Sequence, residues 1–193
     1  MDLTQGTPKD KNSRAKKMML WFGIVSLIMS FGGWTSAFLV SRSRPDWVTD
    51  FELPNAFVIS TVVIVLSSIS FILAKLAIRK GNRALATVLL LITLVLGVLF
   101  IINQVNGFNQ IIDLGYNFTG PTSNVTMSYI YLIAAVHILH VVAGLICVLV
   151  VIYNHFKQKY NSENLLGFEL AATFWHFIDI LWIYLFLFLY FVG

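Results

Sequence analysis

The sequence has little charge and almost no cysteine. Only 11% of its 193 residues are Asp, Glu, Lys or Arg, whereas 58% are apolar and the mean hydropathy is +0.82. Soluble domains carry about 25% charged residues, so this composition excludes a water-soluble globular protein and indicates an integral membrane protein. The single cysteine, Cys147, excludes a disulfide within the chain, and we interpret it as a small packed residue.

The common catalytic signatures are also missing. The chain has no phosphate-binding glycine loop, no GxSxG turn, no paired cysteines and no HExxH, which argues against the usual hydrolase, nucleotide-binding and structural-metal proteins. We attribute the formal net charge of +4 to membrane topology rather than to nucleic-acid binding. No nucleic-acid partner is therefore expected.

Long apolar runs dominate what remains. Helices are predicted at about 17–41, 53–79, 82–106, 126–155 and 166–192, each near the roughly 20 residues that cross a bilayer. Gly81-Asn82 predicts a helix end followed by a capping side chain, while Gly115, Gly120 and Pro121 interrupt the last long run. The predicted fold is all-α, a polytopic bundle of five transmembrane helices in one domain, 17–193, after a polar tail, 1–16.

Basic residues predict the orientation. Eleven Lys and Arg residues fall in the N-terminal segment and in the second and fourth loops, against two in the first loop. The positive-inside rule therefore places the N-terminus in the cytoplasm and the C-terminus outside.

Small residues predict where helices approach closely. Gly23, Ser26, Ser30, Gly33 and Ala37 follow a three-four spacing along the first helix, which favours close contact with another helix. The second helix repeats this pattern with Ala56, Ser60, Ser67, Ser70 and Ala74.

Ionisable residues interrupt the last two helices. His137 and His140 in the fourth helix are expected at the same depth as His176 and Asp179 in the fifth, with Glu169 nearer the inner surface. A charged side chain at the centre of a membrane helix costs about 2.5 to 3.5 kcal/mol on insertion scales, so each residue needs a partner or a function.

Three interpretations of these residues remain open. The imidazoles and carboxylates satisfy each other or backbone carbonyls across the interface of the last two helices, or they bind a metal or haem, or they relay protons. Geometry restricts the second interpretation, because His137 and His140 are three residues apart on one helix face. They cannot bind one haem iron from opposite sides.

The last third of the chain carries a recognisable pattern. It reads His137-x-x-His140-Val141-x-x-Gly144, then Gly167-Phe168-Glu169-x-Ala171 and Trp175-His176-Phe177-x-Asp179-x-x-Trp182. This pattern closely resembles subunit III of the haem-copper oxidases, notably cytochrome c oxidase, and the similarity covers about residues 18–193. The five predicted helices resemble helices three to seven of the seven-helix form, as in the shorter bacterial form.

The resemblance implies a subunit with no active site of its own inside a proton-pumping oxidoreductase. Haem and copper are expected in partner subunits and none in this chain, which would pack against subunit I, with subunit II and possible small subunits nearby. It would bind phospholipid in the bacterial plasma membrane and support proton uptake and turnover. The resemblance assigns an internal polar network and subunit or lipid contacts, none of them catalytic, to His137, His140, Gly144, Glu169, Trp175, His176, Asp179 and Trp182.

The chain departs from the family pattern at two places. Leu27 stands where the family often has a glutamate, and Gln104-Val105 lacks the Glu-Tyr that commonly follows the glutamine. The resemblance also implies a cleft that holds phospholipid, and the first two helices of the seven-helix form make one wall of it. Because those two helices are missing here, we predict that another subunit supplies this wall.

Two relatives of the same kind are alternatives: subunit III of a quinol oxidase and the nitric oxide reductase accessory protein. A metal-dependent membrane enzyme using His137, His140, His176 and Asp179 is an alternative of another class.

Overall fold

The computed structural model describes residues 7–45, 47–48, 53–120, 123–160 and 164–192. These residues form the helices α1 (Pro8–Ser41), α2 (Asn55–Arg79), α3 (Arg83–Asp113), α4 (Val125–Phe156) and α5 (Leu166–Val192). All five helices are long and apolar enough to cross a membrane. The predicted all-α, five-helix membrane fold is confirmed.

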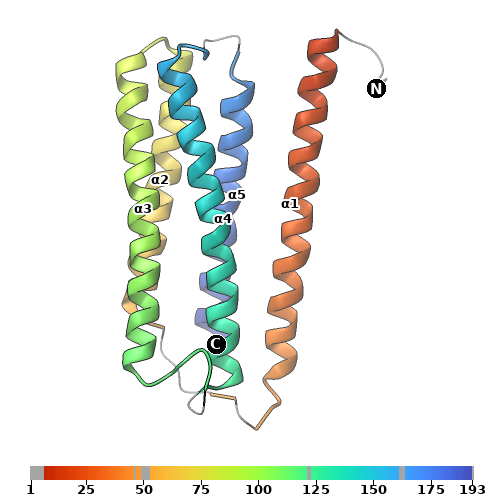
Figure 1. The fold of residues 1–193 in the computed structure, drawn as a ribbon, viewed down its shortest axis with the longest axis vertical. Coiled ribbons are helices and arrows are strands. Elements are labelled where there is room, and N and C mark those ends of the chain that lie inside the picture. The colour runs from red at the N-terminus through yellow and green to blue at the C-terminus, as the bar shows by residue number, and fades with distance from the viewer. Residues whose placement is uncertain (1–6, 46, 49–52, 121–122, 161–163, 193) are drawn as a thin grey trace.

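Four of the helices make a compact bundle and the first stands beside it (Figure 1). Helices α2, α3, α4 and α5 each contact two neighbours in a closed square, while α1 contacts only α4 and α5 among the described helices. The first turn of α1, the α2–α3 turn, the last turn of α4 and the first turn of α5 lie at one end of the bundle. The basic residues predicted to be cytoplasmic therefore share this end, which we call the basic end.

Helix α1 begins well before the predicted residue 17. Thr7 caps it, because the backbone N–H of Asp10 donates to Thr7 Oγ1 at 3.3 Å while the Asp10 carboxylate accepts from the Thr7 backbone at 3.1 Å. Pro8 occupies the first turn, where its missing N–H is harmless. Residues 8–16, predicted as part of a polar tail, are thus the first turns of the helix, and residues 1–6 lie outside the described chain.

Helix α3 continues to Asp113 instead of ending near residue 106. Gly107 lies within this helix and does not break it. Its missing side chain leaves room for the Phe57 ring of α2, which would lie 2.9 Å from an added Cβ. The helix ends before Gly115, whose φ of +89° favours glycine. At the start of α3, Gly81 has a φ of +75°. The Asn82 side-chain oxygen accepts from the backbone N–H of Leu85 and caps the helix, as the sequence predicts.

The two small-residue stripes have different fates. All five residues of the α2 stripe are buried, and Ser67 and Ser70 donate to the α3 carbonyls of Thr93 and Leu89 at 3.2 and 2.9 Å. The α1 stripe faces away from the bundle, since a Cβ added at Gly23 or Gly33 would meet nothing within 4 Å. The spacing of small residues identifies both faces, but of the two only the α2 face is covered by a described helix.

Candidate functional site

His137 is fully buried in α4 and is surrounded by aromatic rings. Its ring centroid lies 5.1 Å from Trp182, 6.0 Å from Phe100 and 6.3 Å from Phe31. Neither ring nitrogen has a hydrogen-bond partner among the described residues. The side chain therefore acts as a packed aromatic ring that joins α4 to α1, α3 and α5.

His140 is bonded within its own helix. Its Nδ1–H donates to the backbone carbonyl of Val136 at 2.8 Å, and its ring meets Phe31 of α1 edge-on at 5.9 Å. Because a carbonyl only accepts, Nδ1 must carry a proton in this contact. This bond stays within α4, so it is not the contact across the last two helices that the first interpretation describes.

His176 and Asp179 do not show the imidazole–carboxylate pairing of the first interpretation. The Nδ1 atom of His176 is hydrogen-bonded to the Ser68 hydroxyl of α2 at 2.6 Å. Asp179 is only 2% exposed, yet neither of its carboxyl oxygens has a hydrogen-bond partner in the described part of the chain. The mutual pairing of imidazoles and carboxylates across the α4–α5 interface is therefore absent from these residues.

Trp175 and Trp182 fill the centre of the bundle. Trp175 lies between two glycines, so that a Cβ added at Gly97 of α3 or Gly144 of α4 would meet its ring at 2.8 or 2.9 Å. Trp182 stacks on Phe57, and its Nε1–H donates to Thr61 Oγ1 of α2 at 3.0 Å. The absence of a side chain at Gly144 thus leaves the space that the Trp175 ring of α5 occupies.

Glu169 lies at the basic end, where it joins three helices. Its carboxylate is 3.5 Å from Lys17 of α1, and 3.4 and 3.3 Å from Lys75 and Arg79 of α2. Partly exposed ion pairs contribute little stability individually, about 0 to 1 kcal/mol. They connect α1 and α2 to the same carboxylate of α5.

The eight predicted residues therefore make several separate contacts. Within the described ranges, no three His, Cys, Asp or Glu side chains lie close enough together to hold a metal ion. His137, His140, His176 and Asp179 accordingly form no shared ligand set there.

Two of the histidine contacts are not predicted by the sequence pattern. Ser68 is the partner of His176, and His155 is a buried imidazole that bonds Thr87 of α3 through Nε2 at 2.9 Å. The position of His155 in the last turn of α4 gave no sign of this contact.

An apolar pocket lies between α1, α4 and α5 towards the basic end. It encloses about 420 Å³ and is lined by Leu20 of α1, Cys147 and Asn154 of α4, and Leu170 and Phe174 of α5, among others. Its walls suit a hydrocarbon chain better than a polar substrate.

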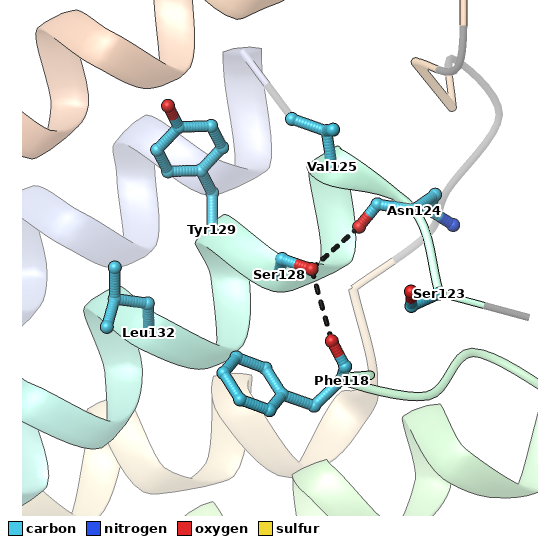
Figure 2. A pocket seen from close by; sticks show the side chains of 7 residues that line it. All are labelled: Phe118, Ser123, Asn124, Val125, Ser128, Tyr129 and Leu132. Carbon is cyan, nitrogen blue, oxygen red and sulfur yellow. Dashed lines mark hydrogen bonds between the residues drawn. The ribbon is translucent and has the colours of Figure 1, made fainter. Parts of the chain in front are cut away.

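A second pocket, of about 360 Å³, lies at the opposite end of the bundle (Figure 2). Its lining is Phe118, Ser123, Asn124, Val125, Ser128, Tyr129 and Leu132. The Ser128 hydroxyl contacts the carbonyls of Phe118 and Asn124 at 3.2 and 3.0 Å, which ties the α3–α4 connection to the first turn of α4. Its lining includes no carboxylate, imidazole or cation.

Replacing His137 with phenylalanine is expected to preserve or raise stability. The change keeps an aromatic ring among Phe31, Phe100 and Trp182 and removes two buried nitrogens without partners, each costing about 1 to 3 kcal/mol when unsatisfied. His137→Ala, which opens a cavity, should lower stability. Thermal unfolding in detergent measures both variants. Equal losses in both would mean that the imidazole nitrogens make a stabilising hydrogen bond.

Comparison with known proteins gives consistent matches. A family model described as cytochrome c oxidase subunit III matches residues 45–193. Subunit 3 of the cytochrome bo(3) ubiquinol oxidase of Pseudomonas aeruginosa is 34% identical over 161 residues, covering 82% of this chain and 75% of that protein. Cytochrome c oxidase subunit 3 of Alkalihalophilus pseudofirmus is 26% identical over 201 residues, covering 100% of this chain and 97% of that protein.

Proposed function

The chain belongs to the cytochrome c oxidase subunit III family, and on that premise we propose how it serves a bacterial haem-copper oxidase. It packs against the haem-bearing subunit I, with subunit II nearby, in the plasma membrane. It binds phospholipid and supports proton uptake and stable turnover during electron transfer to oxygen. Its N-terminus lies in the cytoplasm and its C-terminus outside.

The observation that carries this proposal is the match of the family model over residues 45–193. The site geometry supports a structural role, because the family-pattern residues of α4 and α5 engage in packing. His137 and Trp182 pack against each other within one aromatic cluster, and Trp175 fills the space left by Gly97 and Gly144. None of the eight residues is assigned a catalytic part.

A quinol oxidase is the second candidate. Two relatives, from Pseudomonas aeruginosa and Buchnera aphidicola, are 34% and 33% identical and are named as subunits of cytochrome bo(3) ubiquinol oxidases. The electron donor is set by the neighbouring subunit II. Copper analysis of the purified complex distinguishes a cytochrome c oxidase from a quinol oxidase. A two-copper site in subunit II favours cytochrome c as the electron donor, and its absence favours quinol.

The lipid role is supported by the apolar pocket between α1, α4 and α5. We expect Leu170→Trp to fill part of this pocket and to reduce the phospholipid retained by the purified complex. The matched control is Leu139→Trp, at an α4 side chain that is 67% exposed. Lipid extraction and mass spectrometry give the number of lipids per complex. Equal numbers of lipids in the two variants would show that this pocket is not where the phospholipid binds.

Deletion of this chain tests its function directly. Subunits I and II should still assemble with their haems and start oxygen reduction, but activity should decay during continuous turnover. Restoring the chain should restore the lifetime of the activity. An oxidase whose yield and lifetime are unchanged by the deletion would contradict the proposed role.

A further inference from the structure

One face of the bundle carries polar side chains from the basic end to mid-depth. Its members come from α2 and α5, and we call it the polar face: Ser68, Ile72, Lys75, Glu169, Thr173, His176 and Ile180. We propose that this face docks on a transmembrane helix of the haem-bearing large subunit. The inference rests on the proposed function and adds which surface meets that partner.

Helical spacing aligns these residues on one side. Glu169, Thr173, His176 and Ile180 are four, three and four residues apart along α5, so they follow one another on the same side of the helix. Ser68, Ile72 and Lys75 repeat the four-three spacing along α2. Contacts at both ends join the rows, from Ser68 to His176 at 2.6 Å and from Lys75 to Glu169 at 3.4 Å.

The mid-depth part of this face, at Ser68 and His176, is poorly suited to contact with lipid. Ser68 lies near the middle of α2, and both Ser68 and His176 are only half-buried there. The imidazole uses Nδ1 for Ser68, which leaves Nε2 without a described partner. Hydrocarbon cannot satisfy that nitrogen, whereas a polar side chain of a neighbouring transmembrane helix can.

Two outward positions on the other helices of the bundle are apolar at comparable depth. On α3 the outward residue Val95 is 58% exposed, and on α4 Leu139 is 67% exposed. Such side chains are satisfied by acyl chains and need no protein cover. Compared with these two positions, the polar face is the surface better suited to cover by a protein.

Charge at the basic end indicates the chemistry of the partner. Lys17, Lys75 and Arg79 surround the carboxylate of Glu169, so the described side chains at this point carry more positive than negative charge. A partner carboxylate at this level would complement the surplus. A lipid phosphate would also do so, but its acyl chains offer nothing to His176 at mid-depth. The two observations together favour a protein helix.

Site-directed photocrosslinking in native membranes tests the docking face. The probe is p-benzoylphenylalanine, placed in the polar face at Ile72 or Ile180, which are 48% and 65% exposed. The matched controls are Val95 and Leu139. We expect adducts with the large subunit to be at least about fivefold more abundant from the two polar-face positions. Because all four side chains point outward, the substitutions should leave the fold intact.

Three results would overturn the inference. Adducts with the large subunit mainly from Val95 or Leu139 would place the partner elsewhere while leaving the proposed function intact. Adducts from Ile180 with the mass of a phospholipid would show that lipid covers this face. A preparation in which no haem-bearing subunit accompanies the unsubstituted chain would remove both the docking face and the proposed function.

Discussion

Replacing Trp175 with alanine is expected to cost about 3 to 5 kcal/mol of folding stability, the range for removing a large buried aromatic side chain. Trp175 is fully buried, and its ring occupies the space between Gly97 and Gly144. The cavity left by the mutation cannot close unless α3 and α4 move together. Because membrane proteins are marginally stable like others, we expect little assembled chain to remain in the membrane.

Trp21→Ala is the matched control for this prediction. Trp21 is 58% exposed on α1, so the same chemical change removes few contacts. Quantifying the chain in membranes and its thermal unfolding in mild detergent compares the two variants. Similar losses in both would show that the Trp175 contact with the two glycines contributes little.

Replacing Gly97 with leucine should have the second largest effect. An added Cβ alone would lie 2.6 Å from Leu145 Cδ2 and 2.8 Å from Trp175 Cη2, closer than real contacts allow. Overpacking of this kind costs typically about 1 to 3 kcal/mol, occasionally more, and leucine adds further atoms. The expected result is a lower unfolding temperature and less assembled chain.

Two comparisons make the Gly97 prediction specific. Gly33→Leu makes the same change on α1, where an added Cβ meets nothing within 4 Å, so it should be tolerated. Gly97→Leu combined with Trp175→Ala should cost less than the sum of the single changes, because the leucine enters the vacated space. Additive losses would mean that Gly97 and Trp175 do not share a packing site.

The sequence predicted the helices well because long apolar runs and glycine boundaries are local signals. Gly81-Asn82 ends α2 and caps α3 as expected, and the family pattern contains Gly144 and Trp175, which pack against each other. The helix α1 starts earlier than predicted, because the charged residues after Pro8 resemble a polar tail in the sequence but are helical. Thr7 and Asp10 instead form a capping box there.

Partners of polar residues were harder to predict, because periodicity gives the face of a side chain but not the atom opposite it. His176 bonds Ser68 of α2 rather than a residue of α4, and Asp179 has no hydrogen-bond partner among the described residues. The α1 stripe shows the same limit: its small residues share a face, yet no described helix covers Gly23 or Gly33.

The most direct test of the central claim is a reduced-minus-oxidised visible spectrum of the complex purified through this chain. Native membranes are solubilised in mild detergent, the spectrum is recorded, and it is recorded again after the partner subunits are stripped away. We predict haem bands that leave with a large co-purified subunit. Haem bands that remain with this chain would contradict the account and make its buried histidines a cofactor site.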